Sequence, residues 1–95
     1  MILEFAKLSI LEDKMESFLA AIPKAKAVIS QSKGFIAINF KRSVENPNTV
    51  VALIEWETLE DHTIGFRESD LFPQWRAVIS PFFSAAPEVE HFSIV

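Results

Sequence analysis

Three stretches of this 95-residue chain place bulky apolar side chains on both alternating faces of an extended strand. They run from Ile2 to Leu11, from Phe35 to Arg42 and from Thr49 to Glu57, and a last strand is expected from Val89 to Val95. A sheet that is covered by helices on one face only should alternate apolar and polar residues. The pattern therefore predicts that a second subunit buries the other face, in a homodimer formed through the sheet.

The segments between these predicted strands show helical periodicity. A first helix is expected to open at Asp13, three residues before Glu16, and to have Gly34 as its C-terminal cap. Because proline removes one backbone hydrogen bond, Pro23 predicts a kink or break, with a second helical piece running to about Gln31. The predicted inner face of this helix consists of Met15, Phe18, Leu19, Ile22 and Ile29.

The order of elements is strand, helix, strand, strand, helix, strand, with a turn-rich hairpin loop at residues 43–48. That order predicts an α+β fold of the ferredoxin-like kind, with a four-stranded antiparallel sheet and helices on one side. Residues 1–95 are enough for one domain and too few for two.

The segment from Trp56 to Trp75 holds both tryptophans and one of the two histidines of the chain. Thr58 and Asp61 form a capping-box pattern that starts a helix here. His62 then falls on the same helix face as Phe66, among apolar side chains. It is either a partly buried histidine satisfied by a backbone carbonyl or a proton acceptor in a pocket, since burial favours the neutral imidazole.

A second helical piece begins after Arg67, with Ser69 as its expected N-cap and Pro81 at its end. Its apolar stripe consists of Leu71, Phe72, Trp75, Val78, Ile79 and Phe82. Such a stripe is either core or the wall of a binding site, and a buried Trp75 needs a partner for its N–H group. Arg76 lies at the edge of the stripe, where its simplest role is that of a solvated flank.

The composition narrows the range of functions. The chain has no cysteine, which excludes disulfides, thiolate metal sites and a cysteine nucleophile and fits a cytoplasmic protein. A net charge of −4 argues against a binder of nucleic acid or anionic membranes, and no apolar run is long enough to cross a membrane.

His91, on the last strand, is expected to be a structural or interface residue. No pair of histidines with a carboxylate shows the spacing of a metal site.

Four stretches together match a known pattern: IEWETLEDHTIGFRESDLFPQW, PFF at residues 81–83, PEVEHF at residues 87–92, and the earlier GFIAINFKRSVENPNTV. They resemble the antibiotic biosynthesis monooxygenase domain family, over nearly the whole chain. The resemblance implies two subunits whose sheets close into a dimeric α+β barrel. It also implies a pocket in each subunit, between the sheet and the helices after the third strand.

Members of this family include cofactor-independent monooxygenases that act on aromatic, phenolic or quinol-like small molecules without metal or flavin. By that resemblance His62 is the expected base, Trp75 a hydrogen-bond donor and Arg76 a counter-charge. The further pocket residues implied for a hydrophobic or aromatic ligand are Phe66, Phe72 and Ile79. The first strand lacks the asparagine of haem-degrading relatives, and the chain has no tyrosine to pair with a histidine as in cyclase-like members.

Two other functions stay open at this point. The same pocket could belong to a non-catalytic small-molecule-binding or stress-related barrel, in which replacing His62 changes affinity but no turnover exists to lose. Alternatively, the aromatic cluster around Trp75 is only the core of a structural dimeric domain.

Overall fold

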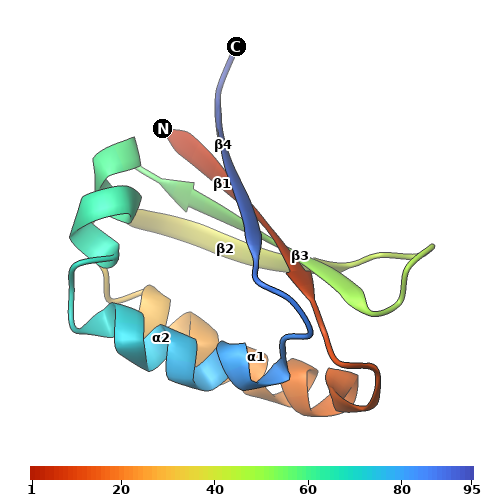
Figure 1. The fold of residues 1–95 in the computed structure, drawn as a ribbon. Coiled ribbons are helices and arrows are strands. Elements are labelled where there is room, and N and C mark those ends of the chain that lie inside the picture. Colours follow the sequence, from red (N-terminus) through yellow and green to blue (C-terminus); the bar gives the residue numbers. More distant parts are fainter.

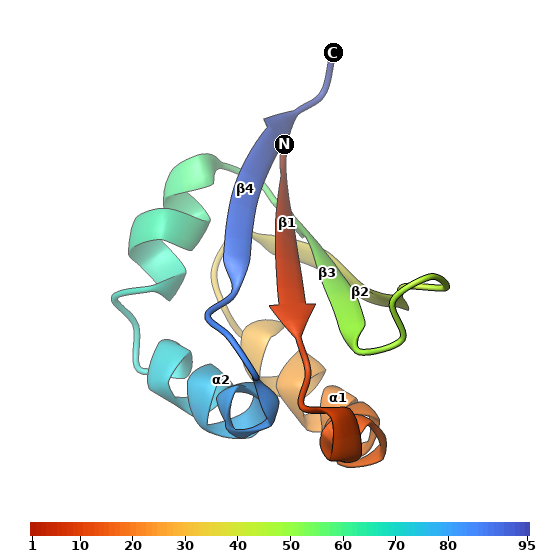
Figure 2. The ribbon, with the colours of Figure 1, turned by 45° about the vertical axis from the view of Figure 1, so that its right-hand side comes forward.

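Four antiparallel strands form one sheet in the order β2-β3-β1-β4 in this computed structural model, which describes residues 1–95. The strands are β1 (Ile2–Ser9), β2 (Phe35–Arg42), β3 (Thr49–Trp56) and β4 (Glu88–Ser93). Helices α1 (Met15–Ile29) and α2 (Leu71–Ile79) pack side by side against one face of the sheet (Figures 1 and 2). The shorter helical segments are η1 (Glu12–Lys14), η2 (Asp61–Phe66) and η3 (Ser80–Phe82). The predicted ferredoxin-like α+β fold is confirmed, and strand ends differ from the predicted ones by only one or two residues.

Strand β1 lies inside the sheet and pairs with both β3 and β4 (Figure 2). Glu4 of β1 is directly opposite Ile54 of β3 and His91 of β4. Residues that are directly opposite across antiparallel strands point to the same face of the sheet. The pairing therefore brings Glu4 and His91 together on the face that the helices cover.

The inner face of β3 is the most completely buried row of the core. Every second residue of this strand is at most 1% exposed, namely Val50, Ala52, Ile54 and Trp56. This is the period of two that a strand imposes on its side chains. Phe18, Ala25 and Ile29 of α1 belong to the same core. Each large apolar side chain that is fully buried in this way contributes roughly 1.5–3 kcal/mol to folding.

Helix α1 departs from the sequence prediction in three respects. It runs through Pro23 without a break, because Phe18 and Ala25 on either side of the proline are fully buried and their packing outweighs one lost hydrogen bond. Leu19 is 40% exposed rather than buried, since the buried stripe follows Phe18 and Ala25. Asp13 does not cap the helix, which has no side-chain cap and is preceded by η1 instead.

Gly34 was predicted to cap α1, and this prediction is wrong. The helix ends at Ile29, its cap residue Ser30 has a right-handed conformation, and Gly34 lies in the later turn that enters β2, with a φ of 82°. Its carbonyl accepts a hydrogen bond of 2.8 Å from the N–H of Glu57. A β-carbon at this position would collide with the side chain of Asp61. The glycine therefore allows the turn to pack against the beginning of η2.

The outer face of the sheet has no helix on it (Figures 1 and 2). Phe5 and Phe92 meet there edge to face, with ring centroids 6.3 Å apart, and Phe92 remains 44% exposed. The outer face is less apolar than the sequence indicated, because the pairing also places Lys7 beside Glu88 and Glu90 opposite Phe5 on this side. The second subunit stays a prediction. None of the helices is both long enough and apolar enough to span a membrane.

Candidate functional site

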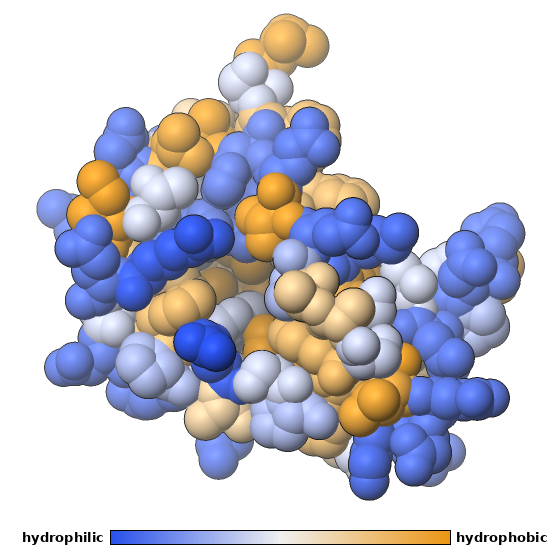
Figure 3. Space-filling model, viewed as in Figure 1, coloured by the Kyte–Doolittle hydropathy of each residue, from blue (hydrophilic) through white to orange (hydrophobic).

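A pocket of about 580 Å³ lies between the sheet and the helical layer. Of its 20 lining residues 13 are hydrophobic, so the wall is mainly apolar. Figure 3 shows this apolar surface in the hollow between sheet and helices, with hydrophilic residues around it. A mostly apolar pocket with a few convergent polar groups is the usual form of a small-molecule site.

Glu4 is the acidic residue of this wall, and it is only 5% exposed. The indole Nε1–H of Trp56 donates a hydrogen bond of 3.0 Å to its Oε1, and Nε2 of His62 lies 3.3 Å from the same oxygen. Burial raises the pKa of Glu4 to about 7, against the lowering effects of the Trp56 hydrogen bond and the charge of Arg67. This carboxyl group can therefore accept or release a proton near neutral pH.

His62 is carried by η2, a short π-helix whose start is fixed by two reciprocal hydrogen bonds. The N–H of Asp61 donates to the hydroxyl of Thr58, and the N–H of Thr58 donates to the carboxylate of Asp61, each over 3.2 Å. The predicted capping box is thereby confirmed. Further along, His62 and Phe66 are 4% and 1% exposed, so this face of η2 points into the protein. Single π-helical turns are frequent at functional sites.

The imidazole of His62 is held on several sides. It stacks on Trp56 with ring centroids 5.4 Å apart, and its Nδ1 lies 2.8 Å from Nε2 of His91. Burial, followed by the charges of His91 and Arg67, lowers the pKa of His62 to about 4. The ring is therefore neutral at pH 7. Its polar partners are His91 and Glu4, rather than the backbone carbonyl considered from the sequence.

Glu4, His62 and His91 form a chain of polar contacts in which all donors point the same way. When Glu4 is ionised, it accepts from Nε2–H of His62, which leaves Nδ1 of that ring as an acceptor. The Nε2–H of His91 must then be the donor across the 2.8 Å contact. If Glu4 instead carries a proton on Oε1, it donates to Nε2 of His62, and the order of donors reverses. Because His62 turns a different nitrogen to each partner, the three groups do not surround a common point, and no cluster of His, Cys, Asp or Glu in the chain is arranged to hold a metal.

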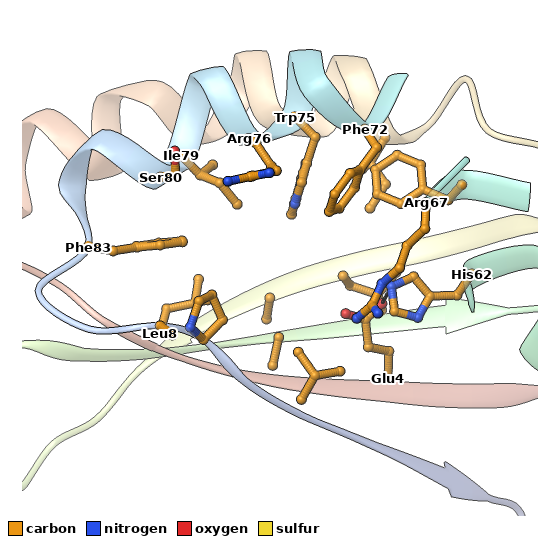
Figure 4. Close-up of a pocket in the computed structure, with 18 of the residues that line it drawn as sticks. Glu4, Leu8, His62, Arg67, Phe72, Trp75, Arg76, Ile79, Ser80 and Phe83 are labelled. Carbon is orange, nitrogen blue, oxygen red and sulfur yellow. Dashed lines mark ion pairs between the residues drawn. The ribbon is translucent and has the colours of Figure 1, made fainter. Parts of the chain in front are cut away.

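All six residues predicted for the site line the pocket. They are His62, Phe66, Phe72, Trp75, Arg76 and Ile79. Phe66 packs edge-on against Phe72 and Trp75, with ring centroids 5.6 and 6.1 Å apart. The indole nitrogen of Trp75 is directed into the pocket (Figure 4). The stripe on α2 is therefore both core and pocket wall.

Two arginines, Arg67 and Arg76, are the cations of the wall. Arg67 stands beside Glu4 and His62 (Figure 4), and its charge lowers the pKa of both. The guanidinium of Arg76 lies 5.9 Å from the centroid of the Phe72 ring. Neither arginine pairs with a carboxylate, since the one side-chain ion-pair contact in the chain joins His62 and Glu4.

Glu4, Arg67 and His91 were not assigned to the site from the sequence. A signal for Glu4 was present, because it takes the inward position between Ile2 and Ala6 on an otherwise apolar strand face. His91 was placed on the correct side of its strand. The register that brings it to His62 is a property of the β1–β4 pairing and has no local signal.

Known proteins of similar sequence point to one family. The sequence profile of the family described as antibiotic biosynthesis monooxygenase matches residues 1–78. The uncharacterized protein YczJ of Bacillus subtilis (strain 168) is 40% identical over 95 residues, which cover all of both chains.

Solved structures show the same fold. A Bordetella bronchiseptica protein described as a candidate antibiotic biosynthesis monooxygenase has a TM-score of 0.95 at 28% identity, over 99% of this chain and 96% of that one. SnoaB from Streptomyces nogalater, described as a cofactor-independent oxygenase, has a TM-score of 0.77 at 14% identity, over 98% and 91%. At that identity the second likeness concerns the fold alone. From the match over residues 1–78 and the full-length likeness to YczJ, the chain belongs to the antibiotic biosynthesis monooxygenase family.

Proposed function

We propose that this protein is a cofactor-independent monooxygenase that oxidises an aromatic, phenolic or quinol-like small molecule in the pocket. The observation that carries the proposal is Glu4, a buried carboxyl group with a pKa of about 7 at the wall of a mainly apolar pocket. Family membership supports a monooxygenase-type role. The fold shared with SnoaB, itself described as a cofactor-independent oxygenase, supports it by analogy.

The chemistry requires a substrate that becomes electron-rich on losing a proton. Glu4 accepts that proton, and the resulting phenolate or carbanion passes one electron to dioxygen. The substrate radical and superoxide combine into a peroxide anion at carbon, which takes the proton back from Glu4; the resulting hydroperoxide eliminates water and leaves a carbonyl group. A methylene carbon thus loses two hydrogens and gains one oxygen atom, and the second oxygen atom of dioxygen leaves as water. The protein supplies the base, the groups that stabilise the substrate anion and a pocket with little water.

Glu4 suits the role of base better than His62, which the sequence favoured. Both ring nitrogens of His62 already face polar partners, and a histidine with a pKa of about 4 is a weak base. On Glu4 only Oε1 is engaged. No buried polar atom of the chain lacks a partner, so Oε2 is open to the pocket that Glu4 lines. His62 then acts as a positioning residue that holds the carboxyl group.

Two pocket residues are suited to hold a negatively charged ligand. The N–H of Trp75 points into the pocket (Figure 4) and is free to donate a hydrogen bond. Arg76, held over Phe72, supplies positive charge. Phe66, Phe72 and Ile79 form the apolar wall against which an aromatic ring packs.

We also propose that the active form is a homodimer joined through the outer sheet face, where Phe5 and Phe92 are in contact. Burying that apolar face would close two sheets into the α+β barrel that the family resemblance implies. Sedimentation at micromolar concentration measures this directly, and a purely monomeric mass would exclude it.

The test of the function is dioxygen uptake by metal-free protein with a panel of anthrones, quinols and flavonoid-like phenols. Uptake should exceed the autoxidation of each compound without protein for at least one of them. Glu4→Gln should remove most of this excess, whereas Glu16→Gln, which changes an exposed carboxylate at the start of α1, away from the pocket and from the proposed dimer face, should keep it. Absence of uptake with every compound, in protein shown to be folded, would favour the alternative of a non-catalytic ligand-binding barrel.

A further inference from the structure

The charges of the pocket differ in sign from those of the whole protein. The chain has 13 acidic and 9 basic residues, for a net charge of −4. Among the pocket residues, by contrast, Glu4 is the only acid, and Arg67 and Arg76 are both cationic. Because the pKa of Glu4 is raised to about 7, its negative charge is only partial at neutral pH. The pocket is therefore a positive site on an acidic protein.

Neither arginine is neutralised within the chain. Despite the 13 acidic residues, no carboxylate lies within 4.0 Å of either guanidinium. Both guanidinium groups enter the same hollow from the helical layer, with Trp75 and Phe72 between them (Figure 4). Arginine presents planar, paired N–H donors, which match the two oxygens of a carboxylate. Two arginines that have no carboxylate partner and lie beside aromatic side chains are therefore suited to a ligand that combines a ring with an acidic group.

We infer that the pocket selects an aromatic molecule bearing a carboxylate, with Arg76 binding the carboxylate and Arg67 facing the oxygen of the reacting ring. The inference rests on the proposed function for the identity of the reacting end, but the preference for an anion is a property of the pocket itself. Arg67 is assigned to the reacting end, and Arg76 to the carboxylate, because only Arg67 stands beside Glu4 and His62.

This orientation also avoids a conflict of charge. A carboxylate next to Glu4 would oppose ionisation of the base and raise its pKa further. With the carboxylate at Arg76, the like charges stay apart and the flat ring lies along Phe72 and Trp75. The phenolic oxygen then comes to the end of the pocket where Glu4 can remove a proton.

The experiment compares 6-hydroxy-2-naphthoate with 2-naphthol, two ligands that share a ring system and hydroxyl and differ in the carboxylate. Binding to the full chain is measured by calorimetry at low and at physiological salt. The naphthoate should bind about tenfold more tightly, the scale of one well-formed bidentate ion pair. Arg76→Gln should remove this preference while leaving the affinity for 2-naphthol within about twofold. Lys26→Gln, which removes an exposed cation from α1 away from the pocket, should leave the preference intact.

Equal affinity of the wild type for the two ligands would overturn the inference, and so would a preference that survives in Arg76→Gln. These outcomes are separate from those of the dioxygen test. Excess uptake with a neutral anthrone, together with no preference for naphthoate, would keep the oxygenase and remove the anion site. A naphthoate preference that depends on Arg76 but comes without uptake by any compound would keep the anion site and remove the oxygenase.

Discussion

The inner and outer faces of the sheet differ in how they treat their charged groups. On the inner face Glu4 is enclosed by Trp56 and His62 and is 5% exposed. On the outer face Phe5 meets Phe92, and the carboxylate directly opposite Phe5, that of Glu90, is exposed. The same strand, β1, supplies Glu4 and Phe5, one residue apart on opposite sides.

The difference shows why apolar character alone does not identify a reactive pocket. Apolar surroundings become chemically useful where they enclose an ionisable group, because loss of water moves its pKa toward neutrality. The inner face has such a group in Glu4, with a pKa of about 7. The outer face offers area for association instead.

The largest effect is expected from Trp56, at the centre of the inner face. Trp56→Ala should lower the free energy of unfolding by about 3–5 kcal/mol, because it empties a fully buried site. Phe92→Ala on the outer face should cost the protomer about 1 kcal/mol or less, since that ring is already 44% exposed. Urea denaturation of both variants measures the contrast, and equal losses would contradict the distinction between the faces. Trp56→Phe, which keeps a ring but removes the N–H donor, should raise the pKa of Glu4 further.

The pH dependence of stability tests whether Glu4 and His62 are shifted in opposite directions. The pKa of Glu4 is about 7 in the folded chain against an ordinary 4.5, so its protonated form stabilises the fold by about 3 kcal/mol at low pH. That contribution is lost as pH rises from about 4.5 to 7. The pKa of His62 is lowered from 6.5 to about 4, so its contribution is present above pH 6.5 and is lost as pH falls to 4.

The two slopes oppose each other over most of the same range, so the wild type should show a shallow profile between pH 4.5 and 6.5. In Glu4→Gln only the titration of His62 remains of the two, so stability should rise with pH. In His62→Gln only the titration of Glu4 remains, so stability should fall with pH. Chemical denaturation at a series of pH values measures all three proteins, with Glu90→Gln as an outer-face control that follows the wild type. Parallel profiles for Glu4→Gln and His62→Gln would contradict the assignment.

The parts of the site that sequence reasoning located depend on local periodicity. Helical periodicity placed Phe66 on the same face as His62 and Phe72, Trp75 and Ile79 on the later stripe, and the family resemblance implied that they belong to a pocket, which all four line. The capping box at Thr58 follows from the chemistry of one helical turn. The ferredoxin-like fold followed from the order of strands and helices along the chain, which leaves few alternatives.

The parts that it missed depend on pairing and packing over long distances in the chain. Glu4 and His91 meet through a strand register, and a register is not encoded by either strand alone. The local rule for Pro23 failed for a similar reason, because core packing held α1 together across the missing hydrogen bond. Gly34 was misassigned because a positive φ suits several kinds of turn besides a helix cap.

A smaller effect is expected on the outer face, where the proposed dimer is tested by charge. Phe92→Asp would place a carboxylate within the proposed interface, beside the aromatic ring of Phe5. The dimer should weaken by on the order of 2 kcal/mol, roughly thirtyfold in Kd. Sedimentation over a range of concentrations measures the shift, while circular dichroism checks that the protomer stays folded. Lys26→Gln, an exposed position on α1 away from the sheet, makes the same change of one negative unit and serves as a charge-matched comparison. If Phe92→Asp leaves the dissociation constant unchanged, the two subunits do not meet through this face.

The smallest change concerns His91, and it resolves the direction of the donors on the inner face. At a pH well above 7 Glu4 is ionised, so His62 should carry its proton on Nε2 and accept from His91 at Nδ1. Nitrogen NMR of the imidazole rings distinguishes the two tautomers. His91→Ala should cost about 1 kcal/mol or less, the scale of one partly exposed hydrogen bond, and should leave His62 in the Nε2–H form, because ionised Glu4 still accepts from that nitrogen. His91→Gln, whose amide N–H can still donate to Nδ1, should recover most of this loss. A wild-type His62 protonated on Nδ1 at high pH would mean that the line of donors runs outward, and that Glu4 keeps its proton in the resting protein and cannot serve as the base.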